Sequence, residues 1–117
     1  MQMPKPTDAD KDRFRSVVPT DTRVEVRPMF GNLGAFVNGN MFMGLFGSSL
    51  GVKLAPADAE RLRAAGGGPF GPDERPMSGW TTLPPATIGT ADGARWIAAA
   101  LDHVAALPAK SSKALKS

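Results

Sequence analysis

The dipeptide Asn38-Gly39 constrains the fold of this chain more than any other feature, because it stands between two apolar runs, AFV and NMF. Both residues tolerate the positive φ that a two-residue type I′ turn requires, so the sequence predicts a tight β-hairpin centred here. Such a turn also fixes which residues pair across the hairpin. The expected pairs are Val37 with Asn40, Phe36 with Met41, Ala35 with Phe42, and Gly34 with Met43.

The stretch that surrounds this hairpin, residues 27–54, holds four of the six Phe and three of the six Met of the chain. Its run MFMGLF is apolar at both odd and even positions, which predicts a strand inside a sheet that is covered on both faces. Strict alternation places Met41, Met43 and Leu45 on one face, and Phe42 and Phe46 on the other. The next strand, LGVKL, places Leu50, Val52 and Leu54 on a shared face.

Three helices are expected around this sheet. Thr7 caps a first helix that ends before Pro19, with Phe14, Val17 and Val18 on its apolar side. Pro56 begins a second helix that buries Ala59 and Leu62 and ends at Gly66. Thr90 caps the last helix, whose apolar residues recur at helical spacing from Trp96 to Leu107.

The remaining segments complete the expected architecture. Residues 22–29 alternate Arg23, Glu25 and Arg27 with apolar residues, as an outer strand does. Residues 66–79 form a long Gly/Pro loop anchored by Phe70 and Met77, and WTTL after it is a short fifth strand. The fold class is therefore α+β, a two-layer sandwich ordered helix, four-stranded antiparallel sheet, helix, fifth short strand and C-terminal helix. Residues 1–110 form one domain, and 111–117 form a disordered basic tail.

Composition excludes several classes of site. The chain has 117 residues, no Cys and a single His, so neither a thiolate metal site nor a Ser-His relay can be assembled within it. No stretch approaches the roughly 20 apolar residues of a membrane span, and a cytoplasmic location is expected. The net charge of +3 comes from Lys110, Lys113 and Lys116, which leaves a neutral body and weak grounds for nucleic-acid binding.

Three cations lie in or beside dense apolar segments and form the candidate binding site: Arg27, Lys53 and Arg75. In one interpretation they are structural, keeping sheet edges from pairing and tying down the loop. In the other they converge on an anion-binding patch beside Trp80. The triplet Gly66-Gly67-Gly68 is interpreted as a helix cap, and the pair Asp73-Glu74 as solvated loop residues.

Several phrases of the sequence, in this order and spacing, resemble the N-terminal domain of the TfoX/Sxy competence regulators over about residues 9–110. They are Arg27-Pro-Met-Phe-Gly31 (with Met29 and Phe30), Phe36-Val-Asn-Gly-Asn-Met-Phe42, Lys53-Leu54, Arg75-Pro-Met-Ser-Gly-Trp80 (with Pro76, Met77 and Gly79) and Leu107-Pro-Ala-Lys110. The resemblance implies a compact α+β domain with no catalytic residues. Relatives are thought to act in bacterial transcription of competence genes alongside the cyclic-AMP receptor protein, and full-length forms carry a second, C-terminal domain.

The expected function is thus a stand-alone, non-enzymatic regulatory domain that binds a protein partner. Two rivals stay open: direct nucleic-acid binding through the basic residues and tail, and a small-anion or ligand site with enzymatic activity. No cofactor, metal or membrane contact is expected. A homodimer is expected to cover apolar surface that three helices leave exposed. The alternative is that loop residues Phe70, Pro76 and Met77 cover the second face within one chain.

Overall fold

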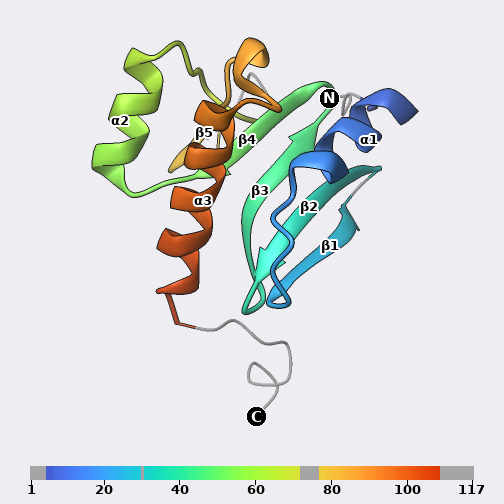
Figure 1. Cartoon of the computed structure of the whole chain (residues 1–117), viewed down its shortest axis with the longest axis horizontal. Helices are drawn as coiled ribbons and strands as arrows, with labels where there is room; N and C mark the ends of the chain where they lie inside the picture. The colour runs from blue at the N-terminus through green and yellow to red at the C-terminus, as the bar shows by residue number, and fades with distance from the viewer. Residues whose placement is uncertain (1–4, 30, 72–76, 109–117) are drawn as a thin grey trace.

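The computed structural model describes residues 5–29, 31–71 and 77–108, which build one antiparallel sheet and three α-helices (Figure 1). The predicted tail, 111–117, lies outside these residues. The elements follow in this order: α1 (Asp8–Val17), β1 (Val24–Met29), β2 (Asn32–Val37), β3 (Asn40–Phe46), β4 (Ser49–Lys53), α2 (Pro56–Ala64), β5 (Trp80–Thr82), a 3₁₀ turn (Pro85–Thr87) and α3 (Ala91–Ala105).

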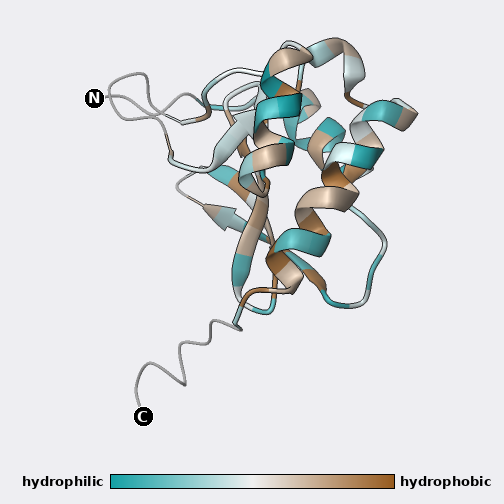
Figure 2. Ribbon diagram, turned by 90° about the vertical axis from the view of Figure 1, so that its left-hand side faces the viewer, coloured by the Kyte–Doolittle hydropathy of each residue, from teal (hydrophilic) through white to brown (hydrophobic). Residues whose placement is uncertain are grey.

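The five strands lie in sequence order, β1-β2-β3-β4-β5, and every neighbouring pair is antiparallel. Helices α1 and α3 lie in front of the sheet in Figure 1, while α2 lies beside the β5 end. Figure 2 shows alternating hydrophilic and hydrophobic stretches along the helices, as expected of helices that bury one side against a sheet. The predicted α+β class and element order are confirmed.

The core lies between the sheet and helices α1 and α3, on what we call the helix face. Phe14 of α1 and Val104 of α3 are fully buried there against Val37 of β2 and Val52 of β4. Leu50, Val52 and Leu54 belong to this core together, as the alternation in LGVKL predicted. Val17 and Val18 only pack at its margin, so the first helix buries less of its apolar side than expected.

The predicted boundaries of the helices are confirmed by their caps. The Thr7 hydroxyl accepts from the Asp10 N–H at 3.0 Å, and the Asp10 carboxylate accepts from the Thr7 N–H at 2.9 Å. Thr90 caps α3 by accepting from the Gly93 N–H, and Pro56 opens α2. Gly66 follows α2 with a φ of 111°, a conformation that favours glycine.

The Asn38-Gly39 turn is confirmed, with φ of 54° and 80° at its two residues. The predicted pairing of β2 with β3 is correct for the two pairs next to this turn and wrong beyond them. Val37 faces Asn40 and Phe36 faces Met41, but Ala35 then faces Met43, and Gly34 faces Gly44. A β-bulge at Phe42 causes the shift, because it places one extra residue on β3.

The same bulge overturns the predicted faces of β3. Phe42 lies in the core together with Met43 and Leu45, whereas Met41 lies on the opposite side of the sheet with Gly44 and Phe46. Two consecutive large residues can share one face only where the strict alternation of a strand is interrupted. One bulge therefore supplies the core with both Phe42 and Met43.

Candidate functional site

The side of the sheet opposite the helices, which we call the loop face, holds the residues of the predicted site that the structure describes. Strand pairing arranges this face in rows that run across the strands. One row contains only small residues at its centre: Gly34, Gly44 and Gly51. Next to this row, Glu25, Phe36 and Met41 are paired across β1, β2 and β3, and Lys53 is paired with Trp80 across β4 and β5.

Phe70 fills the hollow over two residues of the glycine row, Gly44 and Gly51. A Cβ added to Gly51 would clash with the Phe70 ring, and one added to Gly44 would lie 3.4 Å from it. The ring also stacks on Trp80, with centroids 5.4 Å apart, and meets the edge of Phe46 at 6.2 Å. Phe70 thus covers part of the loop face from within the chain, as the single-chain alternative expected; Pro76 lies outside the described residues, and Met77 is exposed.

Lys53 and Trp80 are direct partners in the pairing of β4 with β5, so the structure brings these two predicted site residues together. Lys53 is half-buried, and within the described part of the chain it has no acidic partner. The half-exposed side chains of Met41 and Phe46 lie on the same face of the sheet as Lys53, although the predicted alternation had placed Met41 and Phe46 on opposite faces.

Arg27 does not converge with Lys53. It lies on β1, three strand spacings or roughly 14 Å from β4. Its guanidinium lies 4.6 Å from the centroid of the Phe36 ring and 3.0 Å from the Glu25 carboxylate. Arg75 lies outside the described residues. Among the described residues of the predicted patch, the structure brings together Lys53 and Trp80.

Every arginine in the described residues is paired with an acid close to it in the sequence. The seven pairs join Arg13 to Asp10, Arg15 to Asp12, Arg23 to Asp21, Arg27 to Glu25, Arg61 to Asp58, Arg63 to Glu60, and Arg95 to Asp92. Such exposed local pairs add little stability each. In each pair the acid neutralises an arginine that could otherwise bind a phosphate of a nucleic acid.

Among these seven pairs, the contact of Asp21 with Arg23 has the largest effect on a pKa. The Arg23 guanidinium and main-chain N–H both donate hydrogen bonds to the Asp21 carboxylate. These bonds favour the charged carboxylate and lower the pKa of Asp21 to about 2. The group is half-exposed and belongs to the turn before β1, so its shift reflects a local turn contact rather than a reactive centre.

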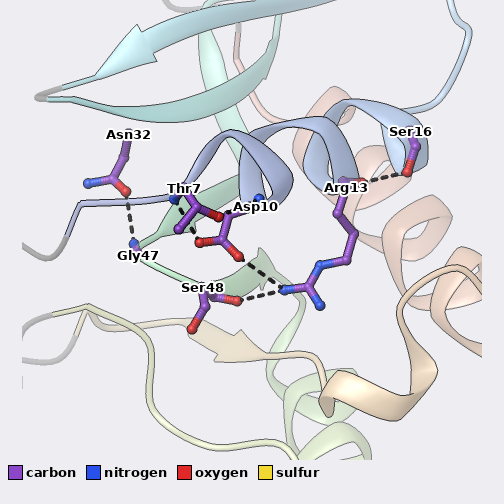
Figure 3. A network of polar contacts seen from close by, with 7 residues as sticks. All are labelled: Thr7, Asp10, Arg13, Ser16, Asn32, Gly47 and Ser48. Atoms are coloured by element: carbon purple, nitrogen blue, oxygen red, sulfur yellow. Dashed lines mark hydrogen bonds and ion pairs between the residues drawn. The ribbon is translucent and has the colours of Figure 1, made fainter.

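A polar network joins the start of α1 to the turn between β3 and β4 (Figure 3). Arg13 donates to the Ser48 carbonyl at 3.1 Å and lies 3.9 Å from the Asp10 carboxylate of the helix cap. Next to it, the buried Asn32 side chain accepts from the Gly47 N–H at 2.8 Å. These contacts satisfy main-chain groups at a turn, which is a structural role.

A second polar contact joins the predicted hairpin to the end of α3. The amides of Asn38 and Asn40 donate to the carbonyls of Ala105 and Pro108, at 3.5 and 3.0 Å respectively. The asparagines on both sides of Gly39 therefore satisfy carbonyls that no further helical turn reaches. Sequence patterns predicted Asn38 as a turn residue but not the contact of Asn40 with Pro108, because it joins positions 68 residues apart.

The described residues give little support for an anion or metal site. A cavity of about 330 Å³ beside Trp80 is lined in part by Arg63, Gly68, Met77 and Ser78, but the Arg63 guanidinium is already 3.0 Å from Glu60. Within residues 5–29, 31–71 and 77–108, no three His, Cys, Asp or Glu side chains gather as metal ligands would. No helix in the same ranges is long and apolar enough to cross a membrane.

Comparison with known proteins bears on the whole of this fold. The family model of the TfoX N-terminal domain matches residues 17–104, from the end of α1 to the last turn of α3. No curated protein and no solved structure matches the chain. The matched region covers most of the 117 residues and includes all five strands. The chain therefore belongs to the TfoX N-terminal domain family.

Proposed function

We propose that this protein is a non-enzymatic regulatory domain that acts in transcription control by binding a protein partner. Membership of the TfoX N-terminal domain family supports a competence-related regulatory role. The local pairing of the arginines supports a protein rather than a nucleic-acid partner, because affinity for a phosphate backbone grows with the number of cations available to neutralise it.

The observation that carries the proposal is the setting of Lys53. This half-buried cation has no acidic partner among the described residues. It is paired with Trp80 on the face of the sheet that also carries the half-exposed side chains of Met41 and Phe46. A cation among apolar side chains is best matched by an apolar segment that carries one carboxylate. Methionine at such a position adapts its shape to a partner at small cost. The proposed contact surface therefore consists of the half-exposed Met41, Phe46 and Lys53, with the buried Trp80 supporting Lys53 from the neighbouring strand.

A gel-shift experiment with a competence-gene promoter and the cyclic-AMP receptor protein tests this function. The domain alone should leave the DNA unshifted at physiological salt, and it should retard further the complex of the receptor protein with DNA. Lys53→Glu should remove the second shift, whereas Arg95→Glu, an equal charge change at an exposed position on α3, should not. Absence of any second shift with the wild-type domain would contradict the proposal.

Direct nucleic-acid binding is the rival that the same experiment measures. It predicts that the domain alone retards DNA and that this binding weakens steeply as salt rises, since counterions are released on binding. A thermal-shift titration with inorganic phosphate and with nucleotides addresses the small-anion rival. A rise in melting temperature that Arg63→Gln abolishes would place an anion in the cavity beside Trp80.

A further inference from the structure

Strand β1 is the free edge of the sheet in the part of the chain that the structure describes. At the opposite edge, the Thr82 N–H of β5 donates to the Gly68 carbonyl at 2.8 Å, and Pro69 bridges to Thr81. The loop before β5 therefore covers that edge. No such cover lies along β1, where four of the six residues are exposed. A free edge offers main-chain groups to another strand.

The pairing of the sheet identifies which main-chain groups of β1 point outward. Val37 and Asn40 close the two-residue hairpin, so the main chain of Val37 is directed towards β3 and that of Phe36 towards β1. Phe36 faces Glu25 in the pairing of β1 with β2. Glu25 and Arg27 therefore bond inward, while the main chains of Val24, Val26 and Pro28 face outward.

Only the central one of these three residues offers both a donor and an acceptor. The Val24 N–H already donates to the Asp21 carbonyl at 2.9 Å, and Pro28 has no N–H. Val26 keeps both groups, and its side chain, 38% exposed, is one of the two most exposed large apolar residues described. An antiparallel strand can therefore form a reciprocal pair of hydrogen bonds with this edge only opposite Val26. The residue that it places there must also direct both its N–H and its carbonyl towards β1.

We propose that β1 pairs with β1 of a second copy of this chain about a two-fold axis through Val26, which gives a continuous ten-stranded sheet across two protomers. In this register Glu25 lies opposite the partner's Arg27, and Arg27 opposite the partner's Glu25. Opposite charges at directly facing positions stabilise strand pairs, and like charges destabilise them. The two neighbouring two-fold registers would place Glu25 opposite the partner's Glu25, or Arg27 opposite the partner's Arg27. Charge and hydrogen bonding therefore favour the same register, the one centred on Val26.

This interface differs from the one expected from the sequence, which was an uncovered face of the sheet. Phe70 already lies on that face. The β1 edge is at the other end of the sheet from Lys53 and Trp80. The dimer would therefore leave the proposed contact surface open on each protomer. The dimer proposal is thus independent of the proposed function, and each can fail without the other.

Sedimentation equilibrium of the full chain at micromolar concentrations tests the proposal. The mass should rise with concentration from 12.3 kDa towards twice that value. Glu25→Arg and Arg27→Glu should each lower the association constant by tenfold or more, and the double exchange of both residues should restore it. Glu60→Arg, an exposed charge reversal on α2, is the matched control and should change nothing.

A cross-link locates the axis independently of stability. The chain has no cysteine, so a disulfide in a single-cysteine variant must join two protomers. Facing residues in a hydrogen-bonded pair have Cα atoms about 5.5 Å apart, within the range of a disulfide. Val26→Cys should therefore oxidise to a covalent dimer, whereas Ser49→Cys, at an exposed position of β4, should not. A single 12.3 kDa species at all concentrations, or a dimer insensitive to Glu25→Arg, would overturn the proposal.

Discussion

The side-chain amide of Asn40 donates a hydrogen bond to the carbonyl of Pro108, 68 residues further along the chain, at a nitrogen to oxygen distance of 3.0 Å. Asn38 makes the corresponding, longer contact with Ala105. The hairpin between β2 and β3 thus holds the end of α3 against the sheet. A turn that looks purely local in the sequence also closes the fold between its central and C-terminal parts.

Removing this contact should weaken the end of α3 first. Asn40→Ala is expected to cost about 0.5 to 1.5 kcal/mol of unfolding free energy, the usual net value of one hydrogen bond. Amide exchange in the last turn of α3 should accelerate more than exchange in β3. Asn40→Asp keeps the size of the side chain but loses the donor, so it should behave in the same way. Unchanged exchange in α3 would contradict the assignment.

The turn itself gives a second prediction. Gly39 has a φ of 80°, which a β-branched residue adopts only under strain. Gly39→Val should therefore cost roughly 1 kcal/mol or more of stability, measured by urea unfolding. Asn38→Gly serves as the control, because glycine accepts the positive φ of that position without a steric penalty. Equal stability of Gly39→Val and the wild type would refute the type I′ turn.

The fit of Phe70 over the glycine row gives a third prediction. Gly51→Ala places a methyl group against this ring, and overpacking of this kind typically costs about 1 to 3 kcal/mol. The cost should shrink when Phe70→Leu is added, which a double-mutant cycle measures. Gly68→Ala is the matched control, since its methyl group would meet only the Thr82 hydroxyl at 3.6 Å. A similar cost for both alanines would show that Phe70 is not the obstacle.

The Asp21 carboxylate gives a prediction about pH. Its pKa is about 2 in the folded chain, below the ordinary value of 3.8, so the hydrogen bonds from Arg23 stabilise the fold while the group is charged. This contribution is present above about pH 4 and is lost as the pH falls towards 2. A carboxyl NMR titration should give the low midpoint, and Arg23→Gln should raise it. A wild-type midpoint near 4 would be inconsistent with the bonds described.

Local patterns predicted most of the fold, because its boundaries depend on residues close to one another. The Thr7 and Thr90 caps, Pro56, Gly66 and the Asn38-Gly39 turn each act within a few positions. The bulge at Phe42 could not be predicted in this way. It follows from the need to fit Phe42 and Met43 on one side of β3, and Met41 with its sulfur over Gly34 on the other.

The candidate site was predicted only in part for the same reason. Strand order decides which cations meet, and sequence patterns did not fix the distance between β1 and β4. Lys53 and Trp80 meet because β5 joins the sheet beside β4, whereas Arg27 lies at the far edge. The hollow that Phe70 fills is equally non-local, since its two glycines, Gly44 and Gly51, come from neighbouring strands.

The local arginine pairs have a consequence for how fast a partner arrives. Each pair is a small dipole, and the field of a dipole fades with distance far more steeply than that of a single charge. A partner of the proposed contact surface is therefore expected to reach the described body of the chain without electrostatic steering. Association rates of such unsteered encounters are roughly 10⁵ to 10⁶ M⁻¹s⁻¹ and depend weakly on salt. If the proposal holds, shape and the charge of Lys53 select the partner only once the two surfaces touch.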